Sequence, residues 1–122
     1  MSIMLRTLII ALAGLLVIAP LCGTSMTVTF SYSNQDTATV TFSSRMGTTG
    51  SWLDSNIVVP ADSSVTTKPH AVEQNYWFSC VVKDAQNATL DSVVIAGYQW
   101  KAGSSVNWSW DGTTLTPYVF IP

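Results

Sequence analysis

Alternation of apolar and polar residues with a period of two is the feature that most constrains how this chain can fold. Residues 27–33 read Thr, Val, Thr, Phe, Ser, Tyr, Ser, which places the apolar side chains on one face of a strand and the hydroxyls on the other. Residues 37–44 repeat this pattern. Beyond residue 25, no window of about 11 residues shows helical periodicity. The pattern therefore predicts an all-β fold.

Turn signals join these strands into pairs. The sequence Asn-Gln-Asp at residues 34–36 separates the first two strands, so we expect residues 27–44 to form a hairpin. Its two apolar faces should lie on the same side of one sheet. Further turn signals, among them the dipeptide Asp111-Gly112, predict two more antiparallel pairs. These pairs are residues 76–83 with 89–96 and residues 105–110 with 113–121.

Shorter segments complete the expected fold. Residues 44–55 are rich in Gly, Ser and Thr and are typical of a loop, and residues 71–75 are irregular. Short strands are expected at residues 57–59 and 65–68, and the strand at residues 89–96 should resume at residues 98–101 after a bulge or bend at Gly97. About eight short strands, spaced about ten residues apart, predict a single antiparallel β-sandwich of the immunoglobulin-like or jelly-roll-like kind.

The N-terminal segment predicts secretion. Residues 8–21 form an apolar run without a charged or hydrogen-bonding side chain. A bilayer-spanning helix needs about 20 apolar residues, so this shorter run, followed by small residues, is typical of a cleaved signal peptide. Cleavage after Ser25 gives a signal peptide at residues 1–25 and a β-sandwich domain at residues 26–122. We expect this domain in the extracellular space or the periplasm.

Cleavage after Ser25 also decides the cysteine chemistry. It removes Cys22 and leaves Cys80 as the one cysteine of the domain. In an oxidising compartment Cys80 is then either buried and inert or available for an intermolecular bond.

The scarcity of charge excludes one class of partner. Only 10% of the residues are charged, whereas a soluble domain usually carries about 25%. Serine and threonine, 15 of each, supply the missing polarity, so the solvent-facing sides of the strands should be hydroxyl surfaces. A net charge of -2 lacks the basic surface that nucleic-acid binding needs, and we expect no nucleic-acid partner.

Residues suited to catalysis are few, and we expect no enzyme. His70 is the single histidine of the chain. It lies beside a predicted edge strand and is interpreted as a solvated surface side chain. No His or Cys residues have the spacing of metal ligands, and no glycine-rich phosphate loop occurs, so neither a metal nor a cofactor is expected.

Tryptophan is the stronger functional signal, because indoles provide flat faces on which sugar rings stack. We take Trp52, Trp77, Trp108 and Trp110 as candidate ligand-binding residues. Trp52 lies in the predicted loop, which cannot easily bury it, and Trp77 is on the less apolar face of its strand. Trp108 and Trp110 share the apolar face of their strand, a position that favours a place in the core over one in a ligand site.

These observations favour a secreted, non-catalytic binding module that recognises carbohydrate or a cell surface through exposed aromatic residues. Two alternatives stay open. One is a small, membrane-active, toxin-like β protein that contacts a membrane through residues 27–44. The other is a self-assembling extracellular structural subunit that forms oligomers through its sheet edges, which carry few of the charges that normally prevent pairing.

Overall fold

The computed structural model of the chain describes residues 26–122, and every regular element among them is a β-strand. The strands are β1 (Met26–Asn34), β2 (Val40–Met46), β3 (Trp52–Val59), β4 (Ser63–Thr66), β5 (His70–Val72), β6 (Phe78–Lys83), β7 (Thr89–Ile95), β8 (Ser104–Trp110) and β9 (Leu115–Phe120). No helix in this part of the chain has the length and hydrophobicity needed to cross a bilayer. The predicted signal peptide at residues 1–25, with Cys22, lies outside the described residues.

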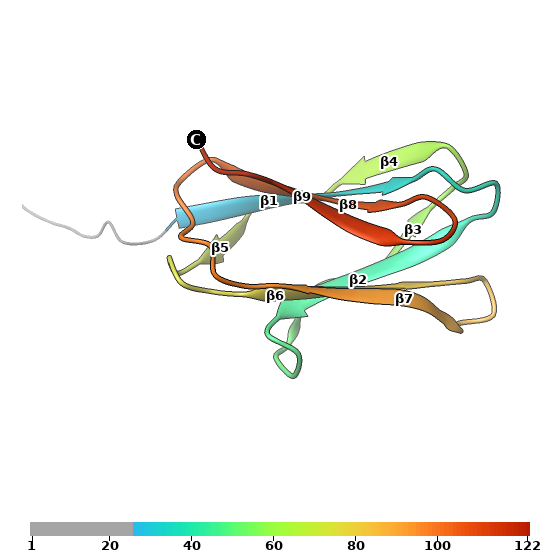
Figure 1. The fold of residues 1–122 in the computed structure, drawn as a ribbon, viewed down its shortest axis with the longest axis horizontal. Helices are drawn as coiled ribbons and strands as arrows, with labels where there is room; N and C mark the ends of the chain where they lie inside the picture. The colour runs from blue at the N-terminus through green and yellow to red at the C-terminus, as the bar shows by residue number, and fades with distance from the viewer. Residues whose placement is uncertain (1–25) are drawn as a thin grey trace, which may run out of the picture.

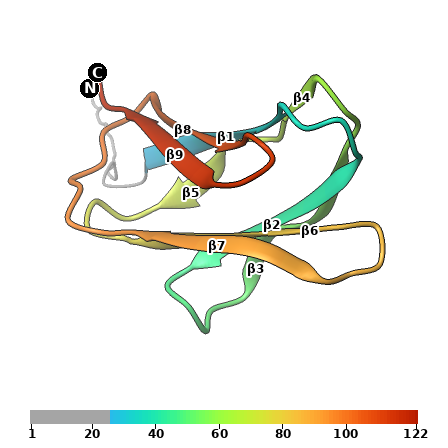
Figure 2. The ribbon, with the colours of Figure 1, turned by 45° about the vertical axis from the view of Figure 1, so that its right-hand side comes forward.

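The strands form two sheets that face each other across one core. The five-stranded sheet has the order β4-β1-β8-β9, with β5 also paired to β1, and the four-stranded sheet has the order β3-β2-β6-β7. Figures 1 and 2 show these sheets as two layers. Phe30 and Trp108 from the first sheet and Phe42 and Phe78 from the second are fully buried between them. The structure thus confirms the all-β, β-sandwich-like architecture.

Two of the predicted antiparallel pairs are confirmed, β6 with β7 and β8 with β9. The turn between β8 and β9 follows from its residues. Asp111 Oδ1 accepts hydrogen bonds from the backbone N–H groups of Thr113 (2.8 Å) and Thr114 (2.7 Å). Gly112 has a φ of 99°, a left-handed conformation that glycine adopts without strain. Sequence therefore identifies a hairpin correctly where the turn is closed by its own side chain.

The predicted hairpin at residues 27–44 is wrong. β1 and β2 lie in opposite sheets, so their apolar faces meet across the core. The buried Asn34 explains this, because its amide nitrogen donates to the carbonyl oxygens of Ala38 (2.7 Å) and Val59 (3.0 Å). Its side-chain oxygen accepts from the N–H of Asp36 (2.9 Å). These bonds hold the connection as a crossing from one sheet to the other.

Strand β1 also departs from the expected antiparallel arrangement. It pairs in parallel with β8, and it pairs antiparallel with β4 and β5. Alternation gives each strand its buried face, but it carries no information on the direction or identity of the neighbouring strand. The sandwich is consequently mixed rather than purely antiparallel.

Three local predictions also need correction. The expected loop at residues 44–55 is largely strand, since β2 continues to Met46 and β3 begins at Trp52. Part of the expected irregular segment at residues 71–75 belongs to β5. Residues 98–101 form a connection instead of a strand. Trp100 fixes that connection, because its backbone N–H donates to Gln74 O (2.9 Å) and its indole N–H to Tyr76 O (2.6 Å).

Candidate functional site

The structure divides the four candidate tryptophans into two buried and two exposed side chains. Trp108 is 0% exposed and Trp110 is 3% exposed, whereas Trp52 is 45% and Trp77 is 43% exposed. Trp108 packs edge-on against Phe30, with 5.6 Å between the ring centroids. A buried indole offers no face to a ligand, so Trp108 and Trp110 leave the candidate site as a correction and Trp52 and Trp77 stay.

The two exposed indoles lie on the outer face of the four-stranded sheet. Trp52 on β3 is paired with Arg45 on β2, and Arg45 is paired with Ser79 on β6, so these three side chains project to the same side. Trp77 precedes Ser79 by two residues and shares its face by alternation. The N–H of Gly47 donates to Trp77 O (2.7 Å), which extends the pairing of β2 with the chain of β6 as far as Trp77.

The turn between β2 and β3 stands out from this sheet, away from the other layer (Figure 2). Its first residue, Gly47, has a φ of 60° and lies beside the Trp77 ring. Its carbonyl oxygen accepts a hydrogen bond from the Ser79 hydroxyl (2.6 Å). At Gly50 an added Cβ would lie 2.6 Å from the carbonyl oxygen of Met46, closer than real Cβ atoms come. The turn that leads into Trp52 is therefore built around glycines and anchored to β6.

This raised turn forms one wall of a hollow of about 340 Å³, which we call the Trp52 trough. Its wall comes from Thr48 and Trp52, and Arg45 also lines it. Its floor is the outer face of β6 and β7, where hydroxyl and valine side chains alternate. The residues that line it are Arg45, Thr48, Trp52, Ser79, Cys80, Val81, Thr89, Ser92, Val93 and Val94. An indole wall above a floor of hydroxyls and methyl groups suits a ligand with both a polar rim and an apolar face.

Arg45 is the one charged residue that lines the Trp52 trough. Its guanidinium carbon lies 4.4 Å from the centroid of the Trp52 ring, a cation–π arrangement. Its Nε is buried and has no hydrogen-bond acceptor among the described residues. The trough thus combines a flat indole with a cation whose N–H groups are not all satisfied by the protein.

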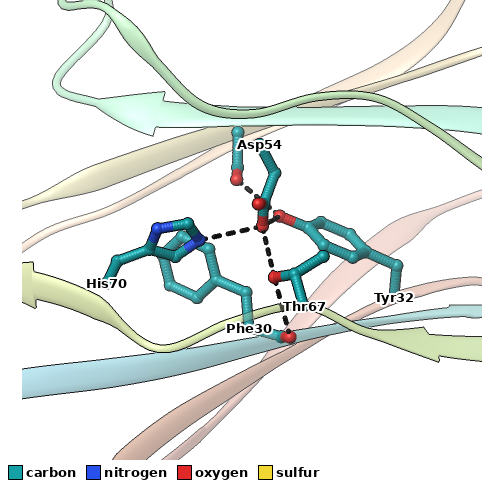
Figure 3. Close-up of polar contacts among 6 residues, drawn as sticks. Phe30, Tyr32, Asp54, Thr67 and His70 are labelled. Atoms are coloured by element: carbon teal, nitrogen blue, oxygen red, sulfur yellow. Dashed lines mark hydrogen bonds and ion pairs between the residues drawn. The ribbon is translucent and has the colours of Figure 1, made fainter.

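A second polar group of residues, which we call the Asp54 cluster, lies between the sheets (Figure 3). The buried Asp54 Oδ2 accepts hydrogen bonds from the Tyr32 hydroxyl (2.6 Å) and the Thr67 hydroxyl (2.7 Å). Since Tyr32 donates its proton to Asp54, the Ser44 hydroxyl donates to Tyr32 Oη at 2.6 Å. The cluster links β1 of one sheet to β2 and β3 of the other.

His70 belongs to the same cluster, which corrects its interpretation as a solvated surface residue. Its side chain is 15% exposed, and its Nε2 lies 3.1 Å from Asp54 Oδ2, an ion-pair contact without hydrogen-bond geometry. The ring also packs against Phe30, with 5.3 Å between centroids. His70 enters this position because β5, an unexpected strand, pairs Val28 of β1 with His70.

The Asp54 cluster is a hydrogen-bond network that joins side chains of both sheets. Burial, and secondly the hydrogen bond to Asp54, raise the pKa of Tyr32 far above its ordinary range, so its phenol stays a neutral donor. No serine, threonine or cysteine hydrogen-bonds to Nδ1 of His70 in residues 26–122, where a nucleophile paired with this imidazole would stand. Sequence carried one signal for the cluster. Tyr32 on the buried face of β1 brings a hydroxyl that needs a partner.

Other reactive groups of the described chain are dispersed or buried. Residues 26–122 contain no group of three or more His, Cys, Asp or Glu side chains placed to hold a metal ion. Cys80 is buried in the core and unpaired among these residues. Burial raises the pKa of its thiol well above the ordinary value, which suppresses the reactive thiolate.

Comparison with known proteins gives no family assignment: no family model, no curated protein and no solved structure matches this chain.

Proposed function

We propose that this chain is a secreted, non-catalytic binding module that recognises carbohydrate, in solution or on a cell surface, in the Trp52 trough. One observation carries the proposal. Trp52 is a large indole that stays 45% exposed beside a hollow lined by hydroxyl and methyl groups. Sugars present an apolar face and a rim of hydroxyls, and this arrangement offers a partner to both.

The sequence also supports two further parts of the proposal, export from the cell and the type of sandwich. The apolar run at residues 8–21 supports export, and cleavage after Ser25 releases residues 26–122 outside the cell. We also propose that the two-sheet fold is an immunoglobulin-like or jelly-roll-like sandwich, kinds of fold that present binding sites on loops and sheet faces.

The test compares the secreted protein with a Trp52→Ala variant on an array of oligosaccharides. We expect Trp52→Ala to weaken binding at least tenfold, which corresponds to about 1.4 kcal/mol, because the stacking face is lost. Trp77→Ala should weaken it less, since Trp77 does not line the trough. Tyr118→Ala is the matched control, because Tyr118 is an exposed aromatic residue on the other sheet. Unchanged binding by Trp52→Ala would refute the proposal.

The membrane-active alternative loses its main support in this fold. It depended on residues 27–44 acting as a hairpin that inserts into lipid. These residues instead supply β1 and β2 of opposite sheets, and their apolar side chains Val28, Phe30, Tyr32, Val40 and Phe42 are buried in the core. Insertion would require the sandwich to open. Dye release from liposomes by the folded protein would restore this alternative.

A further inference from the structure

The outer face of the four-stranded sheet is positively charged on a chain that is otherwise acidic. Two of the five basic residues, Arg45 and Lys83, project from this face. The four strands contain only two acidic residues, Asp54 and Asp91, and both are directed elsewhere. Asp54 is buried between the sheets, and Asp91 Oδ2 accepts the backbone N–H of Leu115 on β9 at 2.9 Å. Neither of these two carboxylates therefore faces the cations, and Arg45 and Lys83 form no ion pair among residues 26–122.

Arg45 is held at the trough without a carboxylate partner. The sole contact of salt-bridge length among the described residues is that between His70 Nε2 and Asp54 Oδ2, on the other side of the sheet. Arg45 instead lies against the face of the Trp52 ring, and this contact orients the guanidinium. The indole has no acceptor atom for the guanidinium N–H groups, because its nitrogen is a donor only. A guanidinium has five N–H donors in a planar fork that matches carboxylate and sulfate oxygens. The unsatisfied buried Nε adds to this demand for an acceptor.

We infer that the ligand of the Trp52 trough is an anionic saccharide, whose carboxylate or sulfate group binds Arg45 while a sugar ring lies against Trp52. This inference rests on the proposed function and narrows its ligand class. The hydroxyls of Thr48, Ser79 and Ser92 line the same hollow and suit the remaining sugar hydroxyls. A single cation beside an indole fits one charged group on a sugar better than a run of phosphates, which requires several cations.

The experiment measures binding of the secreted protein to four immobilised glycans in two matched pairs. Polygalacturonate is compared with its methyl ester, and dextran sulfate with dextran, so that the two pairs separate carboxylate from sulfate recognition. We expect at least tenfold tighter binding to the charged member of one pair, with affinity falling as salt concentration rises. Equal binding to the charged and neutral members of both pairs would overturn the inference.

Substitutions then locate the charge recognition. Arg45→Gln should abolish the preference for the charged glycan, and Arg45→Lys should keep part of it, because a point charge replaces the planar fork. Lys101→Gln is the matched control, since Lys101 is an exposed cation outside the four-stranded sheet and should change nothing. Thermal melting of each variant establishes that it is folded, and Arg45→Lys provides the test if Arg45→Gln unfolds.

The outcomes separate this inference from the proposed function. If Arg45→Gln binds as the wild type does while Trp52→Ala fails, the anionic ligand is refuted and carbohydrate binding stands. If no glycan binds at all, both are refuted. Competition by polyglutamate as strong as that by the charged glycan would show a general anion site and would also overturn the saccharide inference.

Discussion

At the scale of single residues, the buried Asp54 carboxylate depends on donors that other strands supply. Tyr32 and Thr67 each donate a hydrogen bond to Oδ2, and His70 approaches the same oxygen. A buried carboxylate that lost these partners would be strongly unfavourable. The Asp54 cluster therefore stabilises the association of the two sheets at one defined position.

We predict that Tyr32→Phe lowers the free energy of unfolding at neutral pH by about 1 to 3 kcal/mol, the cost of leaving a buried acceptor short of a donor. Chemical denaturation followed by tryptophan fluorescence measures this difference. Tyr118→Phe is the control, because the Tyr118 side chain is exposed and makes no side-chain hydrogen bond within residues 26–122. Equal losses for the two variants would contradict a special role for Tyr32.

Tyr32→Phe should also change how the free energy of unfolding depends on pH in the alkaline range. The pKa of Tyr32 is raised in the folded state, first by burial and then by Asp54, whereas in the unfolded chain it has its ordinary value of about 10. Above that pH the unfolded state releases a proton that the folded state retains, so the free energy of unfolding falls as pH rises. The wild type should lose stability more steeply above pH of about 10 than Tyr32→Phe does.

Cys80 also lowers the free energy of unfolding as pH rises, and because it is present in both proteins it provides the internal control for this experiment. Its pKa is also raised by burial, so it contributes to alkaline destabilisation in both proteins. The Tyr32→Phe variant should therefore keep a residual slope. Parallel stability curves for the two proteins from about pH 9 to about pH 11, roughly the range in which the two groups titrate in the unfolded chain, would contradict the prediction.

At the scale of elements, the turn between β2 and β3 determines whether the Trp52 trough exists. Gly50 faces the carbonyl oxygen of Met46, and an added Cβ would lie 2.6 Å from it. That oxygen belongs to the last residue of β2, so the added Cβ fits only if the turn opens. The position of Trp52 relative to β6 thus depends on a glycine that has no contact with the trough.

We predict that Gly50→Ala lowers the unfolding free energy by about 1 to 3 kcal/mol, as overpacking usually does, and weakens glycan binding because Trp52 shifts. Denaturation and the oligosaccharide array measure the two effects. Thr49→Ala is the control, since Thr49 is the exposed neighbour in the same turn and should leave both quantities nearly unchanged. A Gly50→Ala protein that binds as the wild type does would show that the trough tolerates a moved turn.

The buried faces of the strands could be predicted from the sequence, whereas the pairing of β1 could not. Alternation gave the buried faces of β1 and β6 correctly, because burial of one face is a property of each strand alone. The connection that carries the chain from β1 to the other sheet is held by Asn34, whose hydrogen bonds reach Ala38 and Val59. No local pattern encodes a bond between residues 25 positions apart, so the pairing of β1 was predicted wrongly.

The candidate site was predictable to a similar extent. The loop-like composition around Trp52 and the polar alternation around Trp77 indicated exposure, and both side chains are exposed. Trp108 and Trp110 were weighed between ligand and core, and packing places them in the core. Trp52 lies opposite Arg45 because of the register of β2 against β3, and the sequence does not reveal the two shifts in that register.

At the scale of the whole molecule, the edge strands of the two sheets determine whether the protein remains a monomer. β9 is an edge of the five-stranded sheet and β7 an edge of the four-stranded sheet. The N–H of Leu115 on β9 donates to Asp91 Oδ2 on β7 (2.9 Å), so the two edges are tied together. Backbone N–H groups along β9 point alternately toward β8 and away from it, so residues 115 and 117 have the same orientation, away from β8. Residue 117 is a proline and has no N–H group at this edge.

We therefore predict that the wild type sediments as a monomer, and that combining Asp91→Ala with Pro117→Thr produces concentration-dependent association. The double variant returns two N–H donors to the β9 edge, where a second chain can accept them as an added strand. Sedimentation velocity over about a hundredfold range of concentration checks this, with Pro60→Thr in an exposed turn as the control. Association of the wild type itself would favour the self-assembling structural subunit over a binding module. A monomeric double variant would instead show that the twist of β9, rather than its missing donors, keeps the edge closed to another chain.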